Sequence, residues 1–555
     1  MAAPIVLAIW VAALLPATAE AEQRPNVLLL MAEDLSPRIG AFGDAVAHTP
    51  NLDRLAEQGV RYTRAFTTSG VCAPSRAALM LGAHQISFGA QHMRTSGRDY
   101  LAVPPPGMKA FPELLRAGGY YTYTTSKLDY QFSGPLPTKG SGPFTIWDAA
   151  GLSGPDRDWR NRRDGQPFFG FVNFGVTHES GVFAPFGHWP HSTTHFVMQL
   201  ARLFTAGPRP EDLPKTDPRK IVPEPYYPDT PTVRADIARH YDNIAAMDHQ
   251  VGAVLAELEA DGLADETIVI WTTDHGDGLP RAKRELYDSG IRVPMIVRWP
   301  ERFRPPGAVP GSADDRLVSF VDLAPAILAL AGLDAPESMQ GVDFAAGGPA
   351  REAVFASRDR IDEVEDRQRA ARDRRFKYIL SQRPEREGGH PLEFRDNLAM
   401  MREMRGLLRE GKLDAAQRRW FEPPGRERLF DLHADPHELR NVASDPAYRA
   451  DLRRMRSLLA AWSERVPDWS GESEDAMRER LWPGAEQPLT SAPSFESGPE
   501  GLAIRSPTEG ASIGYRIDDG DWRLYTAPVV VAEGAGVSAK AVRYGWRESE
   551  EARWP

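Results

Sequence analysis

The chain has 555 residues, a formal net charge of −11 and a pI near 5.7. This length allows one large domain with additions, because single hydrophobic cores usually stop growing at ~250–300 residues. Acidic and basic residues are scattered, and the absence of a basic stripe interleaved with aromatic residues excludes nucleic acid as an expected partner.

An apolar run from Ile5 to Leu15 lies near the start of the chain and is followed by small residues. Ala17–Ala19 and Ala19–Ala21 both match a signal-peptide cleavage site. The run is much shorter than the ~20 apolar residues of a membrane span, and no later segment qualifies. Residues 1–21 are therefore predicted to be a signal peptide, which places the protein in the periplasm or outside the cell. The alternative is an uncleaved interfacial anchor, since no Lys or Arg precedes the run.

Cys72 is the only cysteine of the chain. An exported chain with one cysteine cannot form an internal disulfide, so its stability must come from its core. Most lone cysteines are inert buried thiols. A functional role for Cys72 therefore needs support from its surroundings.

Apolar runs alternate with helical patterns from Arg24 to about Pro300, which predicts an α/β fold with a largely parallel central sheet. Three of these runs lead to polar residues: Asn26–Met31 to Glu33 and Asp34, Phe168–Phe174 to His178, and Thr267–Trp271 to Asp274 and His275. In open α/β sheets the ligand site lies at the carboxyl ends of the strands. We therefore expect these polar residues to converge on one crevice.

Two helices are predicted within this region. Thr49 is expected to cap a helix that has Pro50 at its first position and ends near Gly59. A longer helix is predicted from about Val233 to Ala260, with its apolar positions in the core. Asp248, within it, is expected to support the site from behind or to lie at the surface.

The C-terminal half is less regular. From Arg351 to Arg426 the sequence is dense in charges, which are expected at the surface of solvated helices and loops. Arg428–Leu432 and a helix from Pro446 to about Trp462 are predicted to pack on the main domain. Residues 485–493 have the composition of a linker.

Short strand candidates after residue 494 predict a small β-sandwich at residues 494–555. They are Ala511–Ile517, Trp522–Tyr525, Val529–Val531 and Ser538–Tyr544. About 60 residues is marginal for independent stability, so this module is expected to dock on the rest of the chain.

The run Cys72-Ala73-Pro74-Ser75-Arg76 resembles the signature of the type I sulfatases, in which the cysteine of C-x-P-x-R is oxidised to Cα-formylglycine. The flanking run Thr49–Asp53 and Asp274-His275-Gly276 also fall where that family has them. The similarity extends from about Arg24 to Pro300 and resumes near Phe430.

This resemblance implies an alkaline-phosphatase-like fold, a mostly parallel sheet flanked by helices with a smaller C-terminal α+β subdomain. The expected division is a catalytic domain at residues 22–375 and a subdomain at residues 376–484, followed by the linker and the sandwich. It also implies a formylglycine-generating maturation enzyme as a partner. A hydrated aldehyde supplies one hydroxyl to attack sulfur and keeps a second whose deprotonation expels sulfate, a step that a thiol lacks.

By position, the family's single divalent ion, usually Ca²⁺, would be held by Glu33, Asp34, Asp274, His275 and the modified Cys72. Carboxylate oxygens suit such a hard cation. Two positions depart from the common pattern: Glu33 stands where Asp is more frequent, and His275 where many members have Asn.

The resemblance also assigns roles to cationic residues. Arg76 would stabilise the hydrate from one helical turn away, and Lys127 and Lys283 match the lysines that bind sulfate. His178 matches the histidine that protonates or orients the leaving oxygen.

Asp129 stands where many relatives have a histidine that serves as the base for sulfate elimination. Either Asp129 or another group takes that role, with His84 and His92 as candidates. Together with Asp129, His92 and Arg94 are predicted to bind substrate.

Glu33–Pro37 and His92–Arg94 are most similar to the branch that includes heparan N-sulfatases, which cleave a sulfamate N–S bond. The predicted reaction is removal of sulfate, as an ester or a sulfamate, from a sulfated glycan or its fragments. Two alternatives remain: a phosphoester or phosphonate monoester hydrolase of the same fold, and a non-catalytic sugar-binding protein.

Overall fold

The computed structural model describes residues 24–136, 143–151, 158–185, 187–201, 210–345 and 348–555. The predicted signal peptide lies outside them. No helix among the described residues is long and apolar enough to cross a membrane.

An eight-stranded sheet forms the centre of the molecule, in the order β4-β3-β5-β1-β6-β7-β2-β8. Its strands are β1 (Asn26–Ala32), β2 (Val60–Phe66), β3 (Tyr121–Thr125), β4 (Ala149–Gly151), β5 (Phe168–Phe174), β6 (Thr267–Thr273), β7 (Arg292–Arg298) and β8 (Ala313–Ser319). All neighbours are parallel except β7, which runs antiparallel to β6 and β2. The predicted α/β fold with a largely parallel sheet is confirmed.

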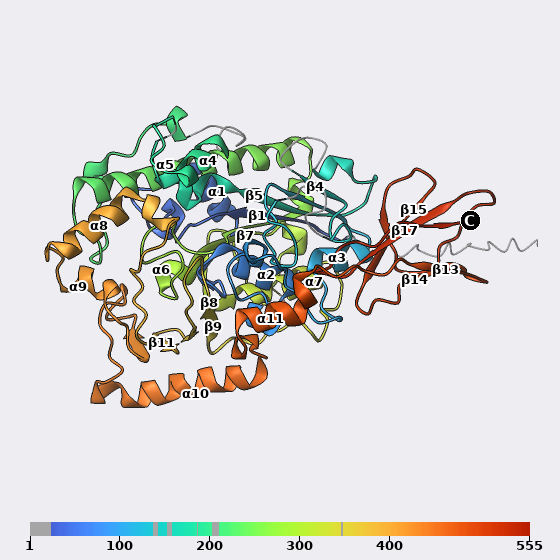
Figure 1. Cartoon of the computed structure of the whole chain (residues 1–555). Coiled ribbons are helices and arrows are strands. Elements are labelled where there is room, and N and C mark those ends of the chain that lie inside the picture. The colour runs from blue at the N-terminus through green and yellow to red at the C-terminus, as the bar shows by residue number, and fades with distance from the viewer. Residues whose placement is uncertain (1–23, 137–142, 152–157, 186, 202–209, 346–347) are drawn as a thin grey trace, which may run out of the picture.

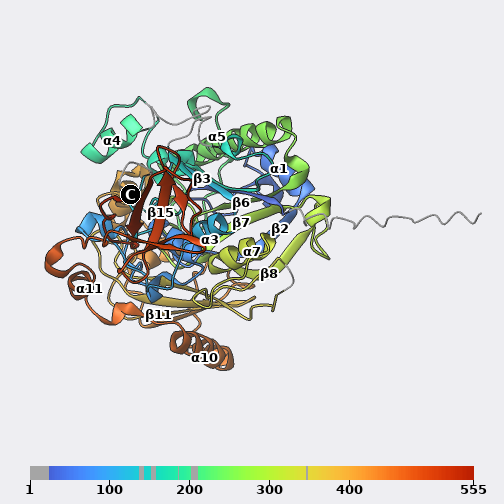
Figure 2. The ribbon, with the colours of Figure 1, turned by 90° about the vertical axis from the view of Figure 1, so that its right-hand side faces the viewer.

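Helices cover both faces of this sheet (Figures 1 and 2). Successive residues of β1 point to opposite faces, so Leu28 and Leu30 pack with α1 (Pro50–Gln58) and α5 (Pro231–Ala260). Leu29 packs with α2 (Cys72–Leu81), α3 (Phe111–Ala117) and α7 (Leu323–Leu330) on the other face. The remaining short helices of this region are α4 (Thr193–Ala201) and α6 (Asp288–Ile291).

Helix α1 begins at Pro50 as predicted, but the Thr49 side chain does not cap it. The Thr49 hydroxyl instead accepts a hydrogen bond from the Gly40 N–H at 3.0 Å. The carboxylate of Asp248 on α5 accepts from the N–H groups of Asn51 and Leu52, at 3.2 and 2.8 Å. Thr49 thus occupies the predicted N-cap position, but a distant carboxylate rather than its own side chain satisfies the helix N-terminus.

A second, antiparallel sheet has the order β12-β11-β10-β9. It consists of β9 (Val354–Arg358), β10 (Gln368–Arg372), β11 (Phe376–Ser381) and β12 (Glu427–Asp431), with α10 (Arg449–Arg465) packed against it. The other helices here are α8 (Ala399–Arg409), α9 (Ala415–Arg418) and α11 (Glu474–Leu481). The sheet contains strands from both sides of the boundary expected between residues 375 and 376.

Several charges between residues 351 and 426 are buried, so the expectation of a charged surface there was partly wrong. Arg358 pairs with Glu285 at 2.7 Å, and Arg372 pairs with Asp288 at 3.2 Å. Buried charges are tolerated when they are paired. These pairs join the second sheet to the segment that follows β6.

The tail contains a hairpin of β13 (Ser494–Gly498) and β14 (Gly501–Arg505) and a four-stranded sheet. That sheet is built from β15 (Ser512–Ile517), β16 (Arg523–Leu524), β17 (Val537–Val542) and β18 (Ala552–Trp554). The expected strand at Val529–Val531 is wrong, since only a single bridge between Leu502 and Val529 forms there. The Tyr544 hydroxyl donates to Glu113 of α3 at 2.8 Å, so the tail packs on the main domain (Figure 1).

Candidate functional site

Three adjacent strands carry polar residues to one edge of the central sheet. β1 lies between β5 and β6, and Glu33 and Asp34 follow its last residue. Asp274 follows β6, and the backbone N–H of Asp34 donates to its carboxylate at 3.1 Å. The sheet therefore brings together the residues that the sequence places after these strands, as the carboxyl-end rule predicts.

Cys72 is the first residue of α2 and is fully buried. Its Sγ lies 3.3 Å from Nε2 of His275 and 4.0 Å from Oδ1 of Asp34. The preceding Val71 provides no side-chain cap to this helix. The N-terminus of a helix favours negative charge, so residue 72 stands in a position suited to an oxyanion.

Cations surround the two buried carboxylates. Lys283 Nζ lies 2.6 Å from Asp34 Oδ2, and His275 Nε2 lies 3.0 Å from Asp34 Oδ1. Arg76 Nε lies 3.0 Å from Asp274 Oδ2, and its Nη1 donates to Asn173 at 2.6 Å. Each carboxylate thus has a positive partner that offsets the cost of its burial.

The ionisation of these groups follows from that arrangement. Burial opposes ionisation of Asp34, but the nearby positive charges, of which Lys283 contributes most, together outweigh it and hold the pKa of Asp34 well below its ordinary value. Burial likewise opposes ionisation of Asp274, but His275 and Arg76 lower its pKa to about 2. Burial would lower the pKa of His275, but Asp274 and Asp34 raise it to about 10. These contacts therefore favour the charged forms of both carboxylates and of the imidazole.

A second chain of charges leads from the site toward the surface. Lys127 Nζ lies 2.9 Å from Glu33 Oε2 and 3.8 Å from Asp129 Oδ2, which lies 3.6 Å from Arg94 Nη2. The Arg94 side chain is 43% exposed, whereas that of Asp129 is 4% exposed. Asp34, Arg94 and Asp129 have φ angles of 51°, 50° and 57°. Positive φ is uncommon outside glycine and clusters at functional sites.

The donor atoms suit one divalent ion. The ligand atoms of Asp34, Cys72, Asp274 and His275 all lie within 4.8 Å of one another, as do those of Glu33, Asp34, Cys72 and His178. Oxygen ligands bind Ca²⁺ at ~2.3–2.6 Å, so ligands on opposite sides of the ion are about 5 Å apart. These side chains can therefore surround one ion with little rearrangement.

His178 follows β5 and is held by Ser180. Its Nδ1 lies 2.8 Å from the Ser180 hydroxyl and accepts from the Ser180 backbone N–H at 3.4 Å. Burial and the nearby charge of Lys283 lower the pKa of His178 to about 4. The ring is therefore neutral at pH 7, and acceptance at Nδ1 places its single proton on Nε2.

The other two histidine candidates have different surroundings. His92 is 8% exposed, and its Nδ1 accepts from the Arg360 N–H at 3.3 Å. His84 is buried and packs edge-on against Trp462 of α10, with ring centroids 5.0 Å apart. These contacts place both histidines beside the second sheet and its helix. No contact joins either one to Cys72 or to the two carboxylates within the part of the chain that the structure describes.

Glu179 was not singled out from the sequence, yet it organises one side of the site. It lies 3.1 Å from Lys283 Nζ and accepts two hydrogen bonds from Arg284, each of 2.9 Å. Its backbone N–H donates to Asp34 at 2.7 Å. Asn173, the partner of Arg76, was also missed, although a polar residue within the apolar β5 run was the available signal.

Comparison with known proteins identifies the family. The family model described as "Sulfatase" matches residues 25–138 and 157–333, more than half of the chain. The protein is a member of the sulfatase family. It is therefore an enzyme, a hydrolase that removes sulfate, and the alternative of a non-catalytic sugar-binding protein is set aside.

Two relatives and one solved structure illustrate the match. The chain is 38% identical over 562 residues to an ulvan-active sulfatase of Formosa agariphila, covering 95% of this chain and 91% of the relative. It is 27% identical to human N-sulphoglucosamine sulphohydrolase, covering 84% and 95%. The structure of a phosphonate monoester hydrolase of Agrobacterium radiobacter has a TM-score of 0.53 at 19% identity, covering 87% of this sulfatase and 100% of that chain. This last similarity shows a shared fold alone.

Removal of the Glu179 carboxylate is predicted to destabilise the sulfatase strongly. Glu179→Ala would remove the buried carboxylate that Lys283 and Arg284 share, leaving Lys283 with Asp34 and Arg284 with the less buried Asp362. The expected cost is about 3 kcal/mol in the free energy of unfolding, the lower end of the range for breaking a buried ion pair. Denaturant unfolding of the purified protein measures this change. Glu410→Ala, which breaks an exposed pair with Lys412, serves as control and should leave the unfolding midpoint unchanged. Equal effects of the two variants would contradict the organising role of Glu179.

Proposed function

We propose that this sulfatase removes sulfate from a sulfated glycan or its fragments, with Cys72 converted to formylglycine as the nucleophile. The observation that carries the proposal is the position of Cys72. It lies at the start of α2, among donor atoms for a divalent ion, with Lys283 paired to one of those donors.

The surroundings of Cys72 fit an oxygen-bearing side chain. The hydrated aldehyde of formylglycine would supply a hydroxyl nucleophile for attack on sulfur. Nη2 of Arg76 is buried and has no hydrogen-bond partner among the described residues. This donor is available to an oxygen at residue 72, one turn earlier on the same helix. Lys127 and Lys283 would neutralise the sulfuryl oxygens.

A divalent ion is the second part of the proposal. Glu33, Asp34, Asp274, His275 and residue 72 would hold it, and its charge would stabilise negative charge on the sulfate group. The carboxylates favour Ca²⁺, although imidazole is an unusual ligand for a hard cation. Lys283 now neutralises Asp34 at 2.6 Å. An ion bound to Asp34 would leave that lysine available to the substrate anion.

His178 would donate a hydrogen bond from Nε2 to the leaving oxygen, orienting it and stabilising the charge that develops on it. The neutral ring with its proton on Nε2 is the form required of such a hydrogen-bond donor. Ser180 fixes that tautomer by donating its backbone N–H to Nδ1.

Asp129 is assigned to substrate recognition rather than to base catalysis. Burial opposes its ionisation, but Arg94 and Lys127 lower its pKa, and a carboxylate with a lowered pKa is a weak base. Its partner Arg94 is 43% exposed, so this pair can meet a saccharide that enters from the surface. His92 lies two residues before Arg94 and accepts a hydrogen bond from the backbone N–H of Arg360. This bond helps to hold the segment that carries Arg94.

The names of two relatives support a saccharide substrate. One is an ulvan-active sulfatase, and the other is an N-sulphoglucosamine sulphohydrolase. Export to the periplasm or beyond is part of the proposal, because polymeric glycans are met outside the cytoplasm. The phosphoester or phosphonate hydrolase is the second candidate, since one such enzyme shares the fold.

The first prediction concerns substrate class. Protein matured with a formylglycine-generating enzyme should desulfate at least one member of a panel of defined O- and N-sulfated saccharides. It should prefer an aryl sulfate to the corresponding aryl phosphate, and Cys72→Ala should abolish both activities. Peptide mass spectrometry should find residue 72 as formylglycine. A preference for phosphate, or activity on aryl sulfates but no saccharide, would overturn the assignment.

The second prediction concerns the metal ion. Calcium added to chelator-treated protein at a hundred times its dissociation constant should raise the free energy of unfolding by about 2.7 kcal/mol. Asp274→Asn should remove most of this effect, whereas Asp265→Asn, at an exposed position, should retain it. Stabilisation by Zn²⁺ but not by Ca²⁺ would assign a different ion to the site.

The third prediction concerns the leaving oxygen. His178→Ala should lower kcat on a saccharide sulfate about 10²–10³-fold, the usual range for loss of one hydrogen-bond donor to a developing negative charge. The loss should be much smaller on 4-nitrophenyl sulfate, because nitrophenolate delocalises its own negative charge. His188→Ala, which removes an exposed histidine, is the matched control. Equal losses on both substrates would exclude this role for His178.

A further inference from the structure

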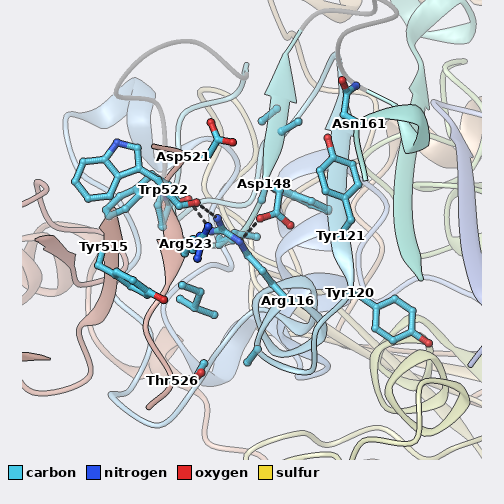
Figure 3. Close-up of a pocket in the computed structure, with 18 of the residues that line it drawn as sticks. Arg116, Tyr120, Tyr121, Asp148, Asn161, Tyr515, Asp521, Trp522, Arg523 and Thr526 are labelled. Carbon is cyan, nitrogen blue, oxygen red and sulfur yellow. Dashed lines mark hydrogen bonds and ion pairs between the residues drawn. The ribbon is translucent and has the colours of Figure 1, made fainter. Parts of the chain in front are cut away.

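A second cleft lies between the tail and the catalytic domain, with a volume of about 1130 Å³. Neither Cys72 nor Lys127 nor Lys283 lines it. Figure 3 shows Tyr515 and Trp522 of the tail on one side and Tyr121 and Asn161 of the catalytic domain on the other. The ion pair of Arg116 with Asp148, both of the catalytic domain, lies between these two groups. This volume exceeds what a single small molecule needs.

The two walls of the cleft are tied together. Arg116 of α3 pairs with Asp148 at 2.6 Å and donates to the backbone carbonyl of Trp522 at 2.9 Å (Figure 3). Lys540 of β17 lies over the rings of Phe144 and Trp522, at 4.6 and 5.0 Å from their centroids. The bond from Arg116 to Trp522 and the contact of Lys540 with Phe144 cross between the catalytic domain and the tail, so the cleft is preorganised.

The lining combines aromatic rings with available cations. Arg163 and Arg523 are exposed, and neither forms an ion pair with any residue in the described part of the chain. Arg116 and Lys540, in contrast, are paired with Asp148 and Glu548. Guanidinium groups bind carboxylates and sulfates through two parallel hydrogen bonds. Aromatic rings such as Trp522 offer flat apolar surface with a polar edge, which matches the C–H face of a sugar ring.

The cleft shares a loop with the Cys72 site. Lys127 and Asp129 pair with Glu33 and Arg94 on the site side. Their neighbours Leu128 and Tyr130 line the cleft. Alternate residues of one segment therefore face the two binding regions, which are separated by that segment.

We propose that this cleft binds acidic sugar units of the glycan at a distance from the bond that is cleaved. The tail then acts as one wall of a second saccharide site rather than as an independent binding module. The proposal rests on the proposed function for the choice of glycan, but binding here needs neither formylglycine nor a metal ion.

The test measures binding of ulvan oligosaccharides to the Cys72→Ala protein by calorimetry. Arg523→Glu in this background should weaken binding about tenfold, the effect expected when one charged hydrogen-bonding group is lost. Trp522→Ala should weaken it similarly. Arg505→Glu, on the same tail and 74% exposed in its side chain, is the matched control and should change binding less than twofold. Neutral dextran should bind at least tenfold more weakly than ulvan.

Unchanged binding by Arg523→Glu, or an equal loss with Arg505→Glu, would overturn the proposal. Equal binding of dextran would overturn the acidic class of ligand. Adding Lys283→Ala to the Cys72→Ala protein distinguishes the cleft from the catalytic site. The loss of binding caused by Arg523→Glu should persist in this background, although the catalytic site is impaired. Failure of the matured enzyme to desulfate glycans would count against the proposed function without altering this binding result. Arg523 is exposed, so its replacement tests the cleft even if Trp522→Ala does not fold.

Discussion

The burial of two carboxylates beside one another, Asp34 and Asp274, is the constraint on which the rest of the site depends. Parallel pairing of β1 and β6 places them together, and the Asp34 N–H donates to Asp274 at 3.1 Å. A buried ionised carboxylate costs several kcal/mol unless it is paired. Lys283, His275 and Arg76 supply that pairing, and Glu179 and Asn173 hold two of these cations in place. A divalent ion would also neutralise the two buried carboxylates. Binding of that ion would therefore free cations such as Lys283 to contact an anionic substrate.

The sequence predicts which side chains lie together where a polar residue follows a strand. Glu33, Asp34, Asp274 and His275 each come directly after an apolar run, so the topology of a parallel sheet suffices to bring them together. Glu179 could not be found in this way. Its function depends on Arg284, which is 105 residues away, and no local pattern indicates that pairing. Asp129 is an intermediate case, because its position was noticed but its ionisation depends on Arg94 and Lys127.

The same distinction applies to the fold. Periodicity predicts α5 and the strands of the central sheet, because core-facing residues repeat at the spacing of each element. The high density of charged residues between residues 351 and 426 suggests an exposed surface, and this is partly wrong. Composition shows that charged residues are present but not which of them form buried ion pairs. Arg358 is buried against Glu285, 73 residues earlier. Likewise, the side chain of Asp248, rather than that of Thr49, accepts hydrogen bonds from the first N–H groups of α1. Asp248 lies 196 residues after Leu52, one of the residues that it contacts.

The presence of a single cysteine has a practical consequence for preparations of this sulfatase. Cys72 is fully buried, so a thiol reagent reaches it only after the chain unfolds. In denaturant, a chain that kept its cysteine titrates as one thiol, and a chain with the proposed formylglycine would titrate as none. No other thiol contributes to the signal. Under the proposed conversion of Cys72, the thiol content of the unfolded protein would therefore give the unconverted fraction directly, and specific activities could be expressed per converted chain.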